Sequence, residues 1–84
     1  MEEYILDEKW GKLLNDVVNE YESATSKFGS FNNAHEGYAV LLEEVDELWD
    51  NIKLNQKNPE RIRKIRQEAV QVAVMALRFL YDVC

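Results

Sequence analysis

Apolar residues in this chain return at steps of three and four over three long segments, and this spacing limits the possible folds more than any other feature. In the first segment they are Trp10, Leu14, Val17, Tyr21, Ala24 and Phe28. Such steps place side chains on one face of an α-helix, whereas a half-buried strand alternates at every second residue. One proline and three glycines among 84 residues leave few turns for a many-stranded fold. The sequence therefore predicts an all-α, three-helix chain that forms one domain over residues 1–84.

Turn and capping residues divide the chain into its three helices. Gly29 is expected to end the first helix. Asn33 with Glu36 three residues later is a variant of the capping box and predicts the start of the second helix. Asn58 followed by Pro59 is typical of an N-cap and a first helical residue, and predicts a third helix that runs to the chain end. The predicted helices cover about residues 3–28, 33–54 and 59–84.

Length, charge and cysteine content restrict the class of protein. The only cysteine is the last residue, Cys84, so no disulfide is expected and a reducing, cytoplasmic location is favoured. The longest apolar stretch, Val72 to Leu77, is much shorter than the ~20 residues of a membrane span. A net charge of −6 disfavours binding to a nucleic-acid polymer, whose phosphates require a clustered cationic surface.

The third helix carries more apolar surface than two partner helices would cover. A folded monomer would expose this surface between Ala69 and Tyr81. A chain of this length also has room for only a modest core, burying about 60% of its unfolded surface. We therefore expect a homodimer or homotetramer.

One glutamate of the second helix does not lie with the other acids. Between residues 36 and 50 there are six acids and no base. On a helical wheel Glu44 falls about 40° from Leu48, at the edge of the buried face. An isolated carboxylate is costly there unless it is paired or bound to a metal. Glu68 similarly interrupts the apolar part of the third helix.

Two facing helices would each offer oxygen ligands one turn apart, as helix bundles do when they hold hard cations. The predicted metal ligands are Glu44, Glu47, Glu68 and Gln71. Ligands of oxygen alone favour Mg²⁺, with Mn²⁺ as a second choice. Zinc is disfavoured because the chain has one histidine and no usable cysteine.

The same residues carry a resemblance. The run "LLEEVDELWD", followed by "EAVQ" with twenty residues between Glu47 and Glu68, resembles the EExxE…ExxD signature of the MazG-like, all-α nucleoside triphosphate pyrophosphohydrolases. The preceding stretch "FGSFNNAHEGYAV" is similar to the one that leads into that signature. The resemblance covers about residues 27–82. It implies a MazG-like helical bundle completed by oligomerisation, and magnesium-dependent hydrolysis of a nucleoside triphosphate to monophosphate and pyrophosphate.

The signature also implies roles for individual residues and one departure. Glu44 and Glu47 match its metal-binding pair, and Glu68 matches the next glutamate. Gln71 stands where the family has aspartate, so the site carries one negative charge less. Two interpretations of Gln71 follow: it is a neutral metal ligand, or it lies outside the coordination shell and bonds Glu68 or the substrate base.

Further residues are candidates for the reaction and for substrate binding. A carboxylate is expected to orient the attacking water, and one or more cations to contact the phosphates. The loop before the second helix offers an aromatic ring to stack on a base and an amide to bond its edge. The catalytic candidates are Glu43 and Glu47, and the substrate-binding candidates are Lys27, Phe31, Asn32, Lys53 and Arg78.

Simpler interpretations compete with these roles. The acidic helix face is, in many helical proteins, only a solvated surface, and the basic run at residues 57–66 a solvated helix start. Large aromatic residues at helical spacing are mostly expected in the core, with stacking on a base as the alternative; they are Trp10, Phe28, Tyr38 and Trp49. The alternative functions are a non-catalytic helical interaction module that binds a basic protein, and a nucleotide-binding sensor.

Overall fold

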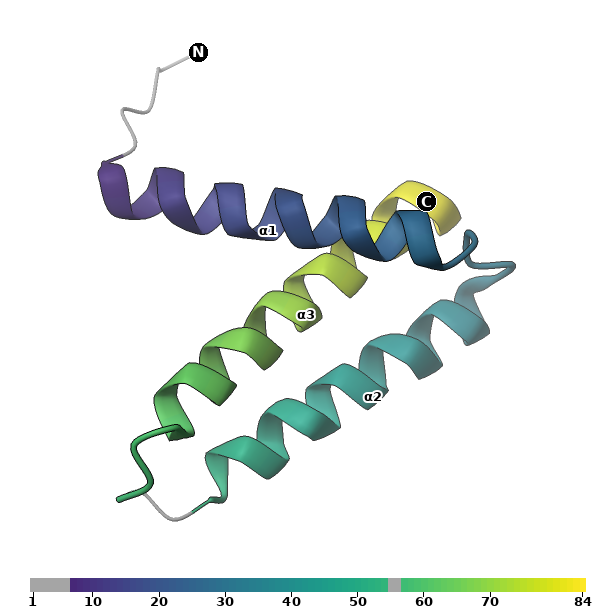
Figure 1. Cartoon of the computed structure of the whole chain (residues 1–84). Coiled ribbons are helices and arrows are strands. Elements are labelled where there is room, and N and C mark those ends of the chain that lie inside the picture. The colour runs from purple at the N-terminus through teal and green to yellow at the C-terminus, as the bar shows by residue number, and fades with distance from the viewer. Residues whose placement is uncertain (1–6, 55–56) are drawn as a thin grey trace.

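The computed structural model of the chain describes residues 7–54 and 57–84. These contain three helices, α1 (Glu8–Lys27), α2 (Ala34–Ile52) and α3 (Arg61–Val83), and no strand. In Figure 1, α2 and α3 run antiparallel, and α1 crosses the C-terminal half of α3. Helix α1 packs against α3 but not against α2. The all-α, three-helix prediction is confirmed for the described residues.

Capping side chains determine where the first two helices begin. The Oδ1 atom of Asp7 accepts a hydrogen bond from Trp10 N at 2.9 Å, so α1 begins at Glu8. The predicted start at residue 3 is wrong because Asp7 itself is extended; residues 3–6 lie outside the described segments. The Oδ1 atom of Asn33 accepts from Glu36 N at 2.9 Å, which confirms the predicted cap of α2.

The third helix begins two residues later than predicted. Asn58 closes a turn instead of capping the helix: its Oδ1 atom accepts from Glu60 N at 2.9 Å, and its carbonyl oxygen accepts from Arg61 N at 3.1 Å. Pro59 lies inside this turn. The first helical residue is Arg61, and Glu60 at the N-cap position makes no capping bond through its side chain.

The core lies along the C-terminal half of α3, against which α1 and α2 each pack. Its buried residues are Ala24, Phe31, Val74 and Met75, and Val74 is completely inaccessible. Gly37 lets α2 lie close to Phe79 of α3, since a Cβ atom at position 37 would lie 2.7 Å from Cδ2 of Phe79. This core holds the loop between α1 and α2 against α3.

The four large aromatic residues that were predicted to lie mostly in the core are exposed, so this prediction is wrong for the single chain. Their exposed fractions are 53% for Trp10, 60% for Phe28, 61% for Tyr38 and 55% for Trp49. The reason is that α1 and α2 each have α3 as their one partner helix among the described residues, and α3 covers only one side of the apolar face of each.

None of the helices in the described segments is both long and apolar enough to span a membrane. Helix α3, the longest, has 23 residues but begins with several charged side chains, among them Arg61, Arg63 and Lys64. Charges of this kind are costly within a bilayer.

Candidate metal and nucleotide site

Three glutamates from two helices meet in one cluster. Glu44 and Glu47 lie one turn apart on α2, and Glu68 comes from the neighbouring helix α3. One carboxylate oxygen from each lies within 4.8 Å of the others. Glu44 and Glu68 are half-buried and Glu47 is exposed. The structure thus brings together three of the four residues predicted as metal ligands.

Burial and mutual repulsion make this cluster electrostatically costly. Burial raises the pKa of Glu44 from 4.5 to about 7, and the nearby charges of Glu47 and Glu68 add to the shift. The pKa of Glu68 is also raised, first by burial and then by Glu47. The Oε2 atom of Glu44 and that of Glu68 are both buried without a hydrogen-bond partner. A bound cation would relieve both the repulsion and the missing contacts.

The donor set fits a small, hard cation. All three groups are carboxylates, and Mg²⁺ binds oxygen at about 2.0–2.1 Å in an octahedral shell, so neighbouring ligand oxygens lie roughly 2.9 Å apart and opposite ones roughly 4 Å apart. Closing the cluster around Mg²⁺ or Mn²⁺ therefore requires the three carboxylate oxygens, which lie within 4.8 Å of one another, to move closer together. No Lys or Arg in the described segments forms an ion pair with Glu44, Glu47 or Glu68.

A cleft of about 650 Å³ adjoins the cluster. This volume lies within the usual range for small-ligand sites. Glu44 belongs both to the cleft and to the cluster, so a ligand in the cleft would touch a metal held there. The lining residues come from the loop and from the facing sides of α2 and α3: Phe28, Gly29, Ser30, Phe31, Asn32, Glu36, Val40, Glu43, Glu44, Met75 and Arg78.

Arg78 is the buried cation of this cleft, with 3% of its surface exposed. Its Nη2 atom donates to Gly29 O at 2.7 Å, and its guanidinium carbon lies 4.5 Å from the centroid of the Phe31 ring. Its Nε atom is buried without a hydrogen-bond partner. Among the described residues no carboxylate forms an ion pair with Arg78. A buried cation without a counter-charge favours an anionic ligand.

Two side chains of α3, those of Arg78 and Asp82, hold the loop between α1 and α2. Phe31 N donates to Asp82 Oδ2 at 2.9 Å, and Arg78 binds the carbonyl group of Gly29. Phe31, predicted to stack on a base, is only 7% exposed and packs in the core. The exposed aromatic ring of the cleft is Phe28, whose helical spacing had predicted a place in the core. Its position directly after the end of α1 is the signal that would have identified it.

Two predicted phosphate-binding residues do not line the cleft. Lys53 follows α2, where its Nζ atom lies 3.3 Å from Asp50 Oδ1 and 5.7 Å from the centroid of the Trp49 ring. Lys27 is exposed in the last turn of α1. Within one chain, Arg78 is therefore the predicted phosphate-binding cation that the fold places at the cleft.

Gln71 contacts α1. Its Nε2 atom donates to Glu20 Oε1 at 2.6 Å. Gln71 and Glu20 line a polar groove between α1 and α3, which also contains an ion pair between Arg66 Nη2 and Asp16 Oδ2 at 2.7 Å. This geometry favours the interpretation in which Gln71 lies outside the metal shell, although its partner is Glu20 and neither Glu68 nor a base.

Replacing Gln71 with Asp tests this arrangement. The shorter, charged side chain would lose the bond to Glu20 and repel its carboxylate, so we expect the free energy of unfolding to fall by about 1 kcal/mol. Magnesium affinity, measured by calorimetry without nucleotide, should change less than twofold. Gln67→Asp adds the same charge at an exposed neighbouring position and is the control. Several-fold tighter magnesium binding by Gln71→Asp alone would return this residue to the metal shell.

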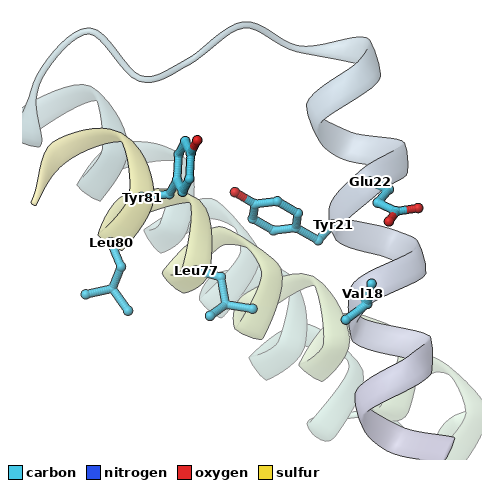
Figure 2. A pocket seen from close by; sticks show the side chains of 6 residues that line it. All are labelled: Val18, Tyr21, Glu22, Leu77, Leu80 and Tyr81. Atoms are coloured by element: carbon cyan, nitrogen blue, oxygen red, sulfur yellow. The ribbon is translucent and has the colours of Figure 1, made fainter.

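A second cleft, of about 580 Å³ between α1 and α3, has a different character. Figure 2 shows the rings of Tyr21 and Tyr81 near each other over Leu77, while the carboxylate of Glu22 points away from them. Its lining is mainly apolar and contains no cluster of carboxylates. This surface is therefore suited to packing and lacks the groups that phosphoryl chemistry requires.

The chain matches no protein-family model, and neither the curated proteins nor the solved structures contain a match to it. The resemblance to the MazG-like enzymes therefore rests on the sequence pattern over about residues 27–82. The clustering of Glu44, Glu47 and Glu68 is the structural observation that accompanies it.

Proposed function

We propose that this protein is a magnesium-dependent, MazG-like nucleoside triphosphate pyrophosphohydrolase, which releases a nucleoside monophosphate and pyrophosphate. The observation that carries the proposal is the cluster of Glu44, Glu47 and Glu68 beside a cleft that also contains the buried Arg78. The site combines carboxylates that have no cationic partner among the described residues with a buried arginine that has no anionic partner there. It therefore suits a polyphosphate with its bound metal ion better than it suits the metal ion alone or the polyphosphate alone.

In this proposal the protein supplies position and charge. Magnesium held by Glu44, Glu47 and Glu68 would neutralise the charge that develops on the phosphates. Glu43 or Glu47 accepts a proton from a water molecule while the oxygen of that water forms a bond to the α-phosphorus. The bond from the α-phosphorus to the oxygen that bridges it to the β-phosphate breaks, and this oxygen leaves with pyrophosphate. The free Nε atom of Arg78 donates to a phosphate oxygen. Glu43 lines the cleft, and Glu47 lies one turn further along α2.

A screen of all common nucleoside triphosphates, with pyrophosphate release as the readout, tests the function. We expect release with at least one triphosphate in the presence of magnesium, and none after the metal is chelated. Release of inorganic phosphate alone, or no product with any triphosphate, would contradict the proposal.

A nucleotide-binding sensor is the second candidate, because Gln71 replaces the family's aspartate and is bonded to Glu20. A sensor would bind triphosphates with magnesium in calorimetry and release no pyrophosphate. A non-catalytic interaction module, by contrast, would bind a basic partner protein through the acidic face of α2 and would show no dependence on magnesium.

We further propose that the active form is a homodimer or homotetramer in which another copy covers α2. An exposed apolar stripe follows this helix at steps of four and three, with exposed fractions between 37% and 61%. Leu77, Leu80 and Tyr81 on α3 are exposed as well, which agrees with the surplus apolar surface expected there. Exposed apolar residues gathered on helix faces in this way are typical of protein–protein interfaces. The stripe consists of Tyr38, Leu42, Val45, Trp49 and Ile52.

Light scattering at micromolar concentration checks the assembly. The wild-type chain is expected to have the mass of two or four copies, and Trp49→Glu to shift it towards the monomer, because a charge buried in an apolar interface is costly. Ile62→Glu is the control, since Ile62 is 68% exposed and lies outside the stripe. A wild-type monomer would contradict the proposed assembly.

A further inference from the structure

The cleft has two chemically different ends. Glu44 adjoins the proposed metal site, and Glu36 precedes it by eight residues on α2, roughly 12 Å along the helix axis. Phe28 and Asn32, from the loop, line the cleft together with Glu36. Arg78 borders the loop, since its Nη2 atom donates to Gly29 O. A nucleotide whose β- and γ-phosphates lie at the metal and whose α-phosphate approaches Arg78 would therefore bring its base to the loop. The buried, unpartnered Nε atom of Arg78 is the observation that points to an anionic ligand in this cleft.

Asn32 and Glu36 form a fixed pair at the loop end. The Nδ2 atom of Asn32 donates to Glu36 Oε2 at 2.9 Å, and Asn32 N lies 3.4 Å from Glu36 Oε1. The carboxylate determines which way the amide points, because an amide oxygen would be repelled in that position. Asn33 caps the same helix turn through Glu36 N and so holds the backbone of Glu36 in place.

The groups that remain free in this pair are mostly acceptors. A carboxylate offers about four lone-pair sites, and Asn32 donates to two of them. The Oδ1 atom of Asn32 accepts no hydrogen bond from the described residues, while one hydrogen remains on Nδ2. An edge rich in acceptors binds a base that presents hydrogen-bond donors, and it repels a base that presents carbonyl oxygens.

We propose that the Asn32–Glu36 pair selects nucleotides whose base carries an exocyclic amino group over those with a carbonyl group in its place. This inference rests on the proposed nucleotide chemistry and names its substrate class. Both side chains are exposed, so the discrimination is expected to be moderate and well below that of a buried hydrogen-bonding site.

Two substrate pairs that exchange an exocyclic amino group for a carbonyl group test the proposal; in each pair the adjacent ring nitrogen also changes from an acceptor to an N–H donor. With magnesium present, we expect kcat/KM for pyrophosphate release to be about tenfold higher for CTP than for UTP, and about tenfold higher for ATP than for ITP. In Glu36→Gln an amide replaces the carboxylate without changing its size, and both ratios should fall to about twofold or less. Asp46→Asn removes a charge from an exposed α2 position that does not line the cleft, and should leave both ratios unchanged.

The outcomes separate this inference from the proposed function. If pyrophosphate is released equally from both members of each pair, or if Glu36→Gln keeps the wild-type ratios, the selectivity is wrong while the function stands. If no triphosphate is cleaved, the function is wrong, and calorimetry with CTP and UTP decides the inference. Tenfold tighter binding of CTP would then support base selection by a sensor, whereas equal binding would overturn it.

Discussion

Glu44→Gln and Glu68→Gln are each expected to lower magnesium-dependent pyrophosphate release by about 100-fold or more, without loss of helicity. Each change removes one carboxylate from the three that form the proposed metal site, and a hard cation gains far more from a carboxylate than from an amide. Steady-state kinetics at saturating magnesium measures the loss. The matched control, Asp46→Asn, should retain activity. Wild-type turnover in both glutamine variants would remove this cluster from the reaction.

The thermal stability of the metal-free Glu44→Gln and Glu68→Gln variants should be maintained or rise, although their activity falls. The pKa of Glu44 is raised from 4.5 to about 7, so the folded, metal-free chain binds more protons than the unfolded chain between these values. Its free energy of unfolding therefore falls as the pH rises from about 4.5 to about 7, and the penalty is complete above that range. Glu44→Gln lacks this penalty. At pH 8 its Tm should equal or exceed that of the wild type by a few degrees.

Magnesium should reverse the pH effect in the wild type. Metal binding competes with the proton on Glu44, so the rise in Tm on adding magnesium is expected to be larger at pH 8 than at pH 6. Thermal melts followed by circular dichroism, with and without the metal, measure this difference. An equal rise at both pH values would show that the protonated group does not face the metal.

Gly37→Ala is expected to lower the free energy of unfolding by about 1–3 kcal/mol, or the Tm by roughly 10 °C. The added Cβ atom would lie 2.7 Å from Cδ2 of Phe79 and 3.1 Å from Cδ2 of Phe31, so core side chains must move. Phe31 packs against Arg78, and its displacement should also reduce nucleotide binding at the cleft.

The matched control for this change is Gly11→Ala. Nothing lies within 4 Å of a Cβ atom at Gly11, which is inside α1. Alanine is the better helix former, so stability should rise by about 0.5–1 kcal/mol. Thermal unfolding of both variants gives the comparison. If Gly37→Ala is as stable as Gly11→Ala, the close approach of α2 to Phe79 is wrong.

Local features of the chain were predictable because they depend on neighbours in sequence. The helical period predicted three helices, and the Asn33–Glu36 spacing predicted the cap that starts α2. The position of Glu44 at the edge of an apolar helix face indicated that burying its carboxylate costs free energy, although the residues next to it in the fold were not yet known. Asn58 shows the limit of such rules, since the same kind of side chain closes a turn over Pro59 and delays α3 to Arg61.

Most contacts between helices were not predictable, because helical spacing indicates which face a residue occupies but does not identify the residue opposite. Gln71 has the spacing of a metal ligand, yet the crossing of α1 over α3 brings Glu20 to its amide. Arg78 was expected to reach a phosphate, and the fold also makes it the anchor of Gly29. The exposure of Trp49 likewise depends on which helices are present to cover α2.

Periodicity and spacing along the chain were enough to predict the helical class, the approximate extent of the helices and the carboxylates on α2 and α3. That Glu44, Glu47 and Glu68 lie within 4.8 Å of one another, and that the cleft beside them contains Phe28, Asn32 and Glu36, depends on how the helices pack. Packing around Val74 and Gly37 sets the separation and rotation of the helices. Small changes in either quantity would separate the carboxylates without altering the helical pattern.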